Sequence, residues 1–249
     1  MKKIESLQNL AIKELVRLHT AKGRKELQAY SAEGLRTVSA LIASGQRLQQ
    51  LYVRADLLAD VQSLVETEHI TLVSDQVAQK MSSLVAPSGV IAVFDLPKRP
   101  DPALLTDGIV LAQINDPGNM GTLIRTAAAM NKKSVVIIEG ADPWGPKVVQ
   151  ATAGLIGAVT IFEWSWQDLL AHKGNYSLCA LVVAGGKNPS DINFGNTLLV
   201  VGNEAHGLPA EWQQLCEQRM TIPMPGNAES LNAAIAGSIA LYLSWFNRS

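Results

Sequence analysis

Two spacings of hydrophobic residues alternate along the chain and predict an α/β protein. From residue 108 onward, short and almost wholly hydrophobic runs alternate with segments in which hydrophobic residues recur every three or four positions. Uninterrupted hydrophobic runs are typical of parallel strands buried on both faces, and the other spacing is typical of the helices that cover such a sheet. We therefore predict a parallel sheet with strands at residues 108–114, 134–138, 158–162, 178–184, 198–202 and 220–222.

The segments between and after these strands predict helices, of which the last is the clearest. Hydrophobic residues from Leu231 to Phe246 follow helical spacing for four turns, beside a row of alanines and one glycine. That row of small residues allows close packing either on the same subunit's sheet or on a second copy of the chain. Prolines at 146 and 209 suit the first turn of a helix. The predicted helices cover residues 120–131, 146–155, 167–171, 209–218 and 231–246.

The first part of the chain has a shorter α/β pattern. We predict a helix near residues 7–18, a second helix opened by Ser31, a helix at 55–66, and strands at 50–53, 70–73 and 90–94. Three prolines and a charge cluster then follow, a composition that suits a linker. The predicted organisation is a small domain at residues 1–95, a linker at 96–105 and a second domain at 106–249.

Composition narrows the class of protein. Hydrophobic residues make up 47% of the 249 residues and charged residues 17%, which indicates a globular protein and excludes a disordered one. The two cysteines form no CxxC pair, so neither a disulfide framework nor a metal site is expected. No hydrophobic run approaches the roughly 18 residues of a membrane span, and no signal sequence begins the chain. We expect a cytoplasmic protein that does not enter a membrane.

The charges are distributed unevenly, although the net charge is only −1. Residues 1–36 hold 8 lysines and arginines against 4 glutamates, whereas residues 101–249 hold 8 basic against 12 acidic residues. A basic first segment suits contact with a phosphate backbone, but fluctuations of this size also occur by chance. Nucleic acid therefore stays an open hypothesis at this point.

Three polar loops follow predicted strands and carry the candidate chemistry. They are residues 115–126 (NDPGNMGTLIRT), 200–209 (VVGNEAHGLP) and 222–232 (IPMPGNAESLN). Because parallel sheets bind ligands beyond the carboxyl ends of their strands, three such loops suggest one composite site. Taken singly, Arg125 could be an exposed side chain, Ser230 a helix cap and His206 a loop hydrogen bonder. The chain has no GxGxxG and no P-loop lysine, which argues against dinucleotides and triphosphates.

The three loops together resemble the three ordered motifs of the SpoU (TrmH) family of RNA ribose 2′-O-methyltransferases. The first residues, with Lys22-Gly23-Arg24 and the segment 33–38 (EGLRTV), resemble that family's ribosomal-protein-like substrate-binding domain. The resemblance implies a C-terminal parallel sheet with a deep trefoil knot. It also implies S-adenosylmethionine as cofactor, a homodimer whose site is completed across the interface, and no metal.

The resemblance also implies roles for individual residues. The expected catalytic residues are Asn119, Arg125, Glu204, Ser230 and Asn232. The expected cofactor-binding residues are Ala184, Gly185, Gly202, Asn203, Ile222, Met224 and Leu231. The expected RNA-binding residues are Lys22, Arg24 and Arg36.

The implied reaction is attack of a ribose 2′-oxygen on an activated methyl group. A guanidinium has a pKa above about 12, so we expect Arg125 to bind phosphate and stabilise developing negative charge, while another group or water takes the proton. The extra N-terminal domain favours large-subunit ribosomal RNA over transfer RNA. The alternatives are a catalytically silent RNA-binding paralogue, a knotted methyltransferase that modifies a base, and, less compatible with the missing glycine motif, a nicotinamide-dependent reductase.

Overall fold

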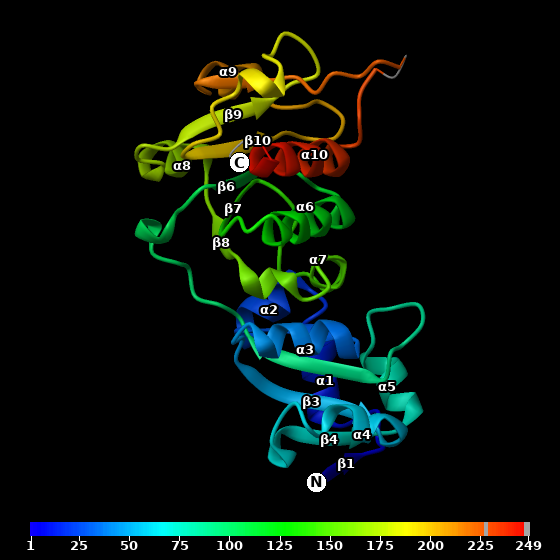
Figure 1. Cartoon of the computed structure of the whole chain (residues 1–249). Helices are drawn as coiled ribbons and strands as arrows, with labels where there is room; N and C mark the ends of the chain where they lie inside the picture. Colours follow the sequence, from blue (N-terminus) through cyan, green and yellow to red (C-terminus); the bar gives the residue numbers. More distant parts are fainter. Residues whose placement is uncertain (227–228, 247–249) are drawn as a thin grey trace. The chain divides into compact units, whose positions relative to one another are not determined.

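The computed structural model describes residues 1–226 and 229–246, which form two compact units. One unit comprises residues 1–98 with 142–157, and the other comprises residues 99–141 with 158–246 of the described chain. The chain therefore passes between the two units three times. Figure 1 shows the elements of each unit.

The first unit is built on a five-stranded mixed sheet of order β1-β4-β3-β5-β2. Strand β5 runs antiparallel to both of its neighbours, and the other pairs are parallel. The strands are β1 (Lys2–Ile4), β2 (Ala29–Glu33), β3 (Leu48–Arg54), β4 (Ile70–Val73) and β5 (Val90–Asp95). The helices are α1 (Leu10–Arg17), α2 (Ala21–Leu27), α3 (Leu35–Ala43), α4 (Leu58–Val61), α5 (Asp75–Met81) and α7 (Pro146–Ala151).

Helix α7 belongs to this unit although residues 99–141, which precede its segment in the sequence, belong to the second unit, and it packs against β2. An ion pair fixes the start of this segment. The Arg24 guanidinium donates to the Asp142 carboxylate at 2.6 and 3.2 Å and to the Leu18 carbonyl at 2.7 Å. Trp144 then contacts the ring of Tyr30 with centroids 5.0 Å apart.

The second unit is built on a six-stranded sheet of order β11-β9-β10-β6-β7-β8. All five neighbouring pairs are parallel, which confirms the prediction from the hydrophobic runs. The strands are β6 (Gly108–Ala112), β7 (Ser134–Ile138), β8 (Thr160–Glu163), β9 (Ser177–Leu181), β10 (Thr197–Val201) and β11 (Gln218–Met220). The helices are α6 (Pro117–Ala129), α8 (Trp166–His172), α9 (Ala210–Gln214) and α10 (Ala233–Phe246).

Helices α6 and α10 pack against each other on one face of this sheet (Figure 1). Gly237 of α10 allows the close approach, because a Cβ atom there would lie 2.4 Å from Leu123 Cδ2 and 3.1 Å from Val201 Cγ2. The opposite face holds a cluster in which the rings of Trp166 and Trp212 stack with centroids 4.7 Å apart. The row of small residues in the last helix thus serves, at Gly237, packing within the same chain.

Several predicted elements need correction. Ser31 lies within β2 and does not open a helix, and the predicted helix at residues 55–66 is reduced to a 3₁₀ turn and the short α4. Strand β1 and helix α2 were not predicted. Helix α6 begins three residues earlier than expected, because Asp116 is its N-cap and accepts a hydrogen bond of 2.8 Å from the Asn119 amide. Pro117 then occupies the first turn, where a missing N–H costs nothing.

Candidate functional site

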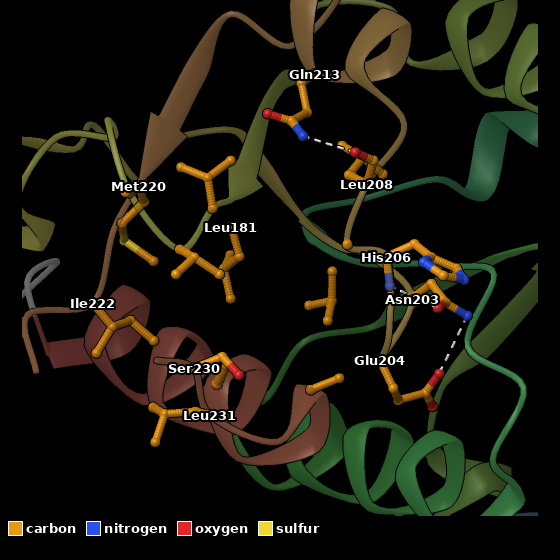
Figure 2. A pocket seen from close by; sticks show the side chains of 18 of the residues that line it. Leu181, Asn203, Glu204, His206, Leu208, Gln213, Met220, Ile222, Ser230 and Leu231 are labelled. Carbon is orange, nitrogen blue, oxygen red and sulfur yellow. Dashed lines mark hydrogen bonds between the residues drawn. The ribbon is translucent and has the colours of Figure 1, made fainter. Parts of the chain in front are cut away.

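A cavity of about 430 Å³ lies at the carboxyl ends of β9, β10 and β11. Its walls are the segments that follow these strands and the start of α10. The side chains of Met220, Leu181 and Ile222 lie on one side in Figure 2, and those of Asn203, Glu204 and His206 lie on the other. The lining residues are Leu181, Val182, Val183, Ala184, Val201, Gly202, Asn203, Glu204, Ala205, His206, Gly207, Leu208, Gln213, Met220, Ile222, Met224, Ser230, Leu231, Ala233 and Ala236.

The structure brings most of the predicted cofactor-binding residues together around this cavity. Ala184, Gly202, Asn203, Ile222, Met224 and Leu231 line the cavity. Gly185 is adjacent in the chain to Ala184 and has a φ of +76°, but it does not line the cavity. Residues 227 and 228, in the last loop, lie outside the described residues.

Gly202 is required by a close approach of two backbone segments. A Cβ atom at this position would lie 2.4 Å from the Leu208 nitrogen and 2.5 Å from the Gly207 carbonyl carbon. Both neighbours are backbone atoms, which cannot move aside as a flexible side chain can. The loop after β10 therefore folds back tightly on the end of its own strand, and only glycine permits this at residue 202.

Asn203 holds this folded-back loop in shape. Its Oδ1 atom accepts hydrogen bonds from the amides of Ala205 at 2.9 Å and His206 at 3.1 Å. Its backbone amide donates to the Gly207 carbonyl at 3.0 Å, and the Gly207 amide donates back at 2.9 Å. Side-chain bonds of this kind mimic a backbone turn. The result is a rigid turn that carries Glu204 and His206.

Three predicted catalytic residues form a continuous hydrogen-bond chain. The Asn119 Nδ2 group donates to Glu204 Oε1 at 3.0 Å, and the Asn232 Nδ2 group donates to Asn119 Oδ1 at 3.2 Å. These residues come from α6, from the loop after β10 and from the segment before α10. The three motifs, which are widely separated in the sequence, therefore meet at one place.

Asn232 also caps α10. Its Oδ1 atom accepts hydrogen bonds from the amides of Ala234 at 2.9 Å and Ile235 at 3.2 Å. Sequence reasoning considered Ser230 as the cap, and the structure assigns that role to Asn232. Ser230 is exposed and lines the cavity instead.

Arg125 differs from the other predicted catalytic residues. Its side chain is exposed on α6 and makes no hydrogen bond or ion pair with any described residue. An exposed guanidinium without a partner is available to an anion outside the chain. Its location is compatible with phosphate binding, and no contact joins it to Glu204 or Asn119.

The predicted RNA-binding residues fall into two groups. Lys22 and Arg36 are exposed, on α2 and in the first turn of α3. Arg24 is only 4% exposed and is held by Asp142 and the Leu18 carbonyl. The assignment of Arg24 to RNA therefore needs correction, because the guanidinium is buried and three of its five N–H groups already donate to Asp142 and Leu18.

Sequence reasoning missed further residues of this region. Asp116 caps α6 and its amide lies 3.4 Å from Glu204 Oε1, and Gln213 donates to the Leu208 carbonyl at 2.7 Å from the far side of the loop. The Asp-Pro pair at 116–117 was a usable signal, since a capping residue followed by proline often begins a helix. Nothing in the sequence near Gln213 indicated its contact.

The arrangement suits an amphipathic organic ligand. Hydrophobic side chains such as Leu181, Ile222 and Leu231 line part of the cavity, and its polar side chains include the Glu204 carboxylate and the Ser230 hydroxyl. A pocket of this kind binds an apolar body and orients it through few polar groups. Within residues 1–226 and 229–246, no three His, Cys, Asp or Glu side chains gather as metal ligands would. No helix in that same part of the chain is long and hydrophobic enough to span a bilayer.

Comparison with known proteins identifies the family. Residues 108–242 match the model of the SpoU rRNA Methylase family, and residues 9–92 match the MRM3-like substrate binding domain. An uncharacterized tRNA/rRNA methyltransferase of Synechocystis is 32% identical, covering 96% of this chain and 92% of that protein. The 23S rRNA (guanosine(2553)-2′-O)-methyltransferase of Bacillus subtilis is 26% identical, covering 97% and 98%.

A solved structure extends this likeness to the whole fold. The AdoMet-bound rRNA methyltransferase from Sinorhizobium meliloti superposes with a TM-score of 0.87 at 27% identity, covering 98% of this chain and 97% of that one. The first family match spans more than half of the chain and includes Asn119, Glu204 and Asn232. This chain belongs to the SpoU rRNA Methylase family.

Proposed function

We propose that this protein is an RNA methyltransferase that transfers a methyl group from S-adenosylmethionine to a ribose 2′-hydroxyl of large-subunit ribosomal RNA. One observation carries the proposal: Asn119, Glu204 and Asn232, one residue from each family motif, are joined by hydrogen bonds, and Glu204 also lines the cavity. The Bacillus subtilis relative, named as a 23S rRNA 2′-O-methyltransferase, matches over nearly the full length of both chains.

The cavity fits S-adenosylmethionine in size and in chemistry. Hydrophobic side chains such as Leu181, Ile222 and Leu231 suit the adenine ring, and Gly202 lets the loop after β10 fold back closely on its strand at the cavity. When bound, the cofactor supplies a methyl group that its sulfonium already activates. The residues proposed to hold it are Ala184, Gly185, Gly202, Asn203, Ile222, Met224 and Leu231.

The protein's contribution is then to bind and orient the ribose. Arg125, exposed and unpaired among the described residues, binds the phosphate next to the target ribose and stabilises the charge that develops on the 2′-oxygen. Its guanidinium keeps its proton, as arginine side chains do in proteins. Glu204, oriented by Asn119, and Ser230 face the 2′-hydroxyl, and its proton leaves to a neighbouring group or to water.

Lys22 and Arg36 of the first unit contact the RNA backbone, in our proposal, and the excess of basic residues at 1–36 supports this. Changing both to alanine should weaken RNA binding and leave cofactor binding unchanged. Lys80→Ala, which removes another exposed positive charge, from α5, is the control. Equal RNA affinity of the double variant and the control would contradict this role.

We also propose a homodimer formed through the second unit, a trefoil knot in its C-terminal segment, and action in the cytoplasm on ribosomal RNA. Hydrophobic side chains exposed on α10 support the dimer, among them Tyr242 at 48% and Trp245 at 51%. The path of the chain after β9 supports the knot. Lys187, after β9, pairs with Met220 of β11, and the chain beyond β11 then returns to the cavity with Leu231. The proposed domains are residues 1–95 and 106–249 with a linker at 96–105, and residues 142–157 pack with the first of them.

A map of ribose 2′-O-methylation tests the function. RNA from a strain that lacks the gene is compared with RNA from strains restored by the wild type, by Arg125→Ala and by Arg125→Lys. We expect loss at one nucleotide of large-subunit RNA, recovery with the wild type and little recovery with either variant. Lysine keeps the charge but lacks the planar fork, so full activity of Arg125→Lys would exclude a bidentate role. An unchanged map would favour a silent RNA-binding protein or a base methyltransferase.

A further inference from the structure

Two residues outside the cavity adopt a backbone conformation that is costly for them. Gln113 and Glu139 directly follow β6 and β7, with φ of 58° and 51°. They lie side by side, each one residue beyond its strand, because the preceding residues Ala112 and Ile138 are partners in the sheet. A left-handed conformation costs a residue other than glycine about 1 kcal/mol or more, so two adjacent cases call for compensating contacts.

The two residues stabilise each other. The Gln113 Nε2 group donates to Glu139 Oε2 at 2.9 Å, and the Gln113 amide donates to the Ile138 carbonyl at 2.7 Å. The side-chain bond joins the two turns, and the backbone bond extends the pairing of β6 with β7 by one step. Glu139 is exposed, and its carboxylate accepts the Gln113 side chain.

The left-handed turn at Gln113 directs its carbonyl toward the loop after β10. That oxygen accepts hydrogen bonds from Asn203 Nδ2 at 2.9 Å and from Asn115 Nδ2 at 3.1 Å. The Oδ1 atom of the same Asn203 side chain organises the turn that carries Glu204. The residue that directly follows β6 thus fixes the orientation of Asn203 across the end of the sheet.

The bonds continue without interruption to the proposed active site. Asn203 Nδ2 also lies 3.4 Å from Glu204 Oε2, and Glu204 Oε1 receives the Asn119 side chain at 3.0 Å. Neither Gln113 nor Glu139 lines the cavity. Both act only through Asn203, since no described contact joins either of them to Ser230 or Asn232.

We propose that Gln113 and Glu139 are positioning residues for methyl transfer, which hold Asn203 and thereby the Glu204 carboxylate in the reactive orientation. The role in methyl transfer rests on the proposed function, whereas the contacts of Gln113 with Asn203 and with Glu139 follow from the geometry alone. The left-handed conformation of Gln113 is needed for this contact, because a residue in a right-handed or extended conformation would turn its carbonyl away from Asn203.

Substitutions at Gln113 distinguish the effect of its carbonyl direction from the effect of its side chain. Gln113→Gly adopts the left-handed conformation without cost, so the carbonyl should keep its direction and the transfer rate should stay within about twofold of the wild type. Gln113→Val disfavours that conformation strongly, and we expect the single-turnover rate to fall about tenfold or more, since small misplacements at a reacting centre are costly. Glu139→Ala should lie between them, and Glu139→Gln, whose amide oxygen still accepts from Gln113, should recover the wild-type rate.

A second measurement does not depend on activity. Hydrogen exchange at the Ala205 and His206 amides reports whether Asn203 still holds its turn. We expect faster exchange in Gln113→Val and unchanged exchange in Gln113→Gly, with rates compared at a temperature where circular dichroism shows each variant folded. A role in stability alone would lower the melting temperature of Gln113→Val without changing the rate per folded molecule.

The outcomes separate this inference from the proposed function. If the wild type transfers no methyl group to RNA, the proposed function fails, and the exchange data still decide whether Gln113 orients Asn203. If the wild type is active and folded Gln113→Val transfers at the same rate, the positioning role is wrong. The role is also wrong if Gln113→Gly loses as much activity as Gln113→Val.

Discussion

At the scale of single residues, the site depends on positions where one side chain is allowed for a definite physical reason. Gly202 is the strictest, because a Cβ atom there would overlap backbone atoms of residues 207 and 208. We predict that Gly202→Ala abolishes measurable S-adenosylmethionine binding in calorimetry and lowers the free energy of unfolding by about 1–3 kcal/mol, as overpacking does. Gly226→Ala, where nothing lies within 4 Å of an added Cβ, is the matched control. Normal cofactor affinity in Gly202→Ala would show that the loop has another way to close.

The two cysteines illustrate burial without chemistry. Burial raises the pKa of Cys179 and of Cys216 to about 12, and for Cys216 the neighbouring Glu217 carboxylate adds to the effect. Because thiolate is the reactive form, we predict that neither thiol reacts with Ellman's reagent at pH 8 in the folded protein, and that both react after denaturation. Rapid labelling of the native protein would contradict the prediction.

The same shift makes stability depend on pH. In the unfolded chain these thiols ionise near pH 8.5, whereas in the folded protein they stay neutral to a much higher pH, so folding opposes ionisation. The stabilising contribution is complete below about pH 8.5 and is lost as the pH rises toward 12. The melting temperature should therefore fall less between pH 8 and 10.5 in a Cys179→Ala, Cys216→Ala double variant than in the wild type.

At the scale of elements, Asn232 has two functions that mutation can separate. Its oxygen caps α10 and its amide nitrogen donates to Asn119. Asn232→Asp keeps the cap, because aspartate and asparagine are equally good N-caps, but loses the donor. We expect nearly unchanged thermal stability and a transfer rate about tenfold lower, corresponding to one hydrogen bond of about 1.4 kcal/mol.

Asn232→Ala provides the comparison for this prediction. It removes both functions, so we expect the same loss of rate together with about 1 kcal/mol less stability. Differential scanning calorimetry and single-turnover kinetics measure the two effects on the same samples. A fully active Asn232→Asp would remove the Asn119 contact from the mechanism and leave Asn232 as a helix cap alone.

At the scale of the whole molecule, local patterns in the sequence predicted one half better than the other. Five of the six parallel strands were predictable because they contain buried hydrophobic runs, whereas β11 has the sequence Gln-Arg-Met and shares only Met220 with the predicted strand at 220–222. Strand β1 was not predictable, because it has three residues, two of them exposed lysines, and its pairing with β4 depends on tertiary contact. Ser31 misled because serine is a good helix cap, yet it is buried within β2.

The residues of the site were predicted better than the residues that hold them in position. Motif residues converge because carboxyl ends of parallel strands share an edge of the sheet, so Asn119, Glu204 and Asn232 could be expected to meet. The left-handed turns at Gln113 and Glu139 could not be predicted, because neither residue type favours that conformation. Burial of Arg24 was equally hidden, since its partner Asp142 lies 118 positions away in the sequence.

Exposed aromatic side chains on α10 lead to a prediction about assembly. Tyr242 and Trp245 are about half exposed and their rings lie 5.9 Å apart, forming a hydrophobic face. If that face joins two copies, Tyr242→Ser with Trp245→Ser should convert a dimer to a monomer in sedimentation velocity and reduce methyl transfer. Leu104→Ser, at a side chain 58% exposed in another segment, should leave the dimer intact. A monomeric wild type would contradict the proposed homodimer.

The Arg24–Asp142 ion pair leads to a prediction about which basic residues stabilise the fold and which bind RNA. Arg24 has 5% of its side chain exposed and Asp142 has 33%, so the pair is partly screened by solvent. Removing one partner leaves the other charge and the Leu18 carbonyl without their bonds, and we expect Arg24→Met to lower the free energy of unfolding by about 2 kcal/mol. The same substitution should not change the RNA affinity of the folded protein.

The double variant of Lys22→Ala with Arg36→Ala should show the opposite behaviour, with weaker RNA binding and unchanged stability, because both side chains are exposed. Denaturation in urea and binding assays at two salt concentrations distinguish the two cases, since loss of phosphate contacts also reduces the salt dependence of binding. If Arg24→Met lowers RNA affinity and its salt dependence without loss of stability, then Arg24 must leave Asp142 to contact RNA.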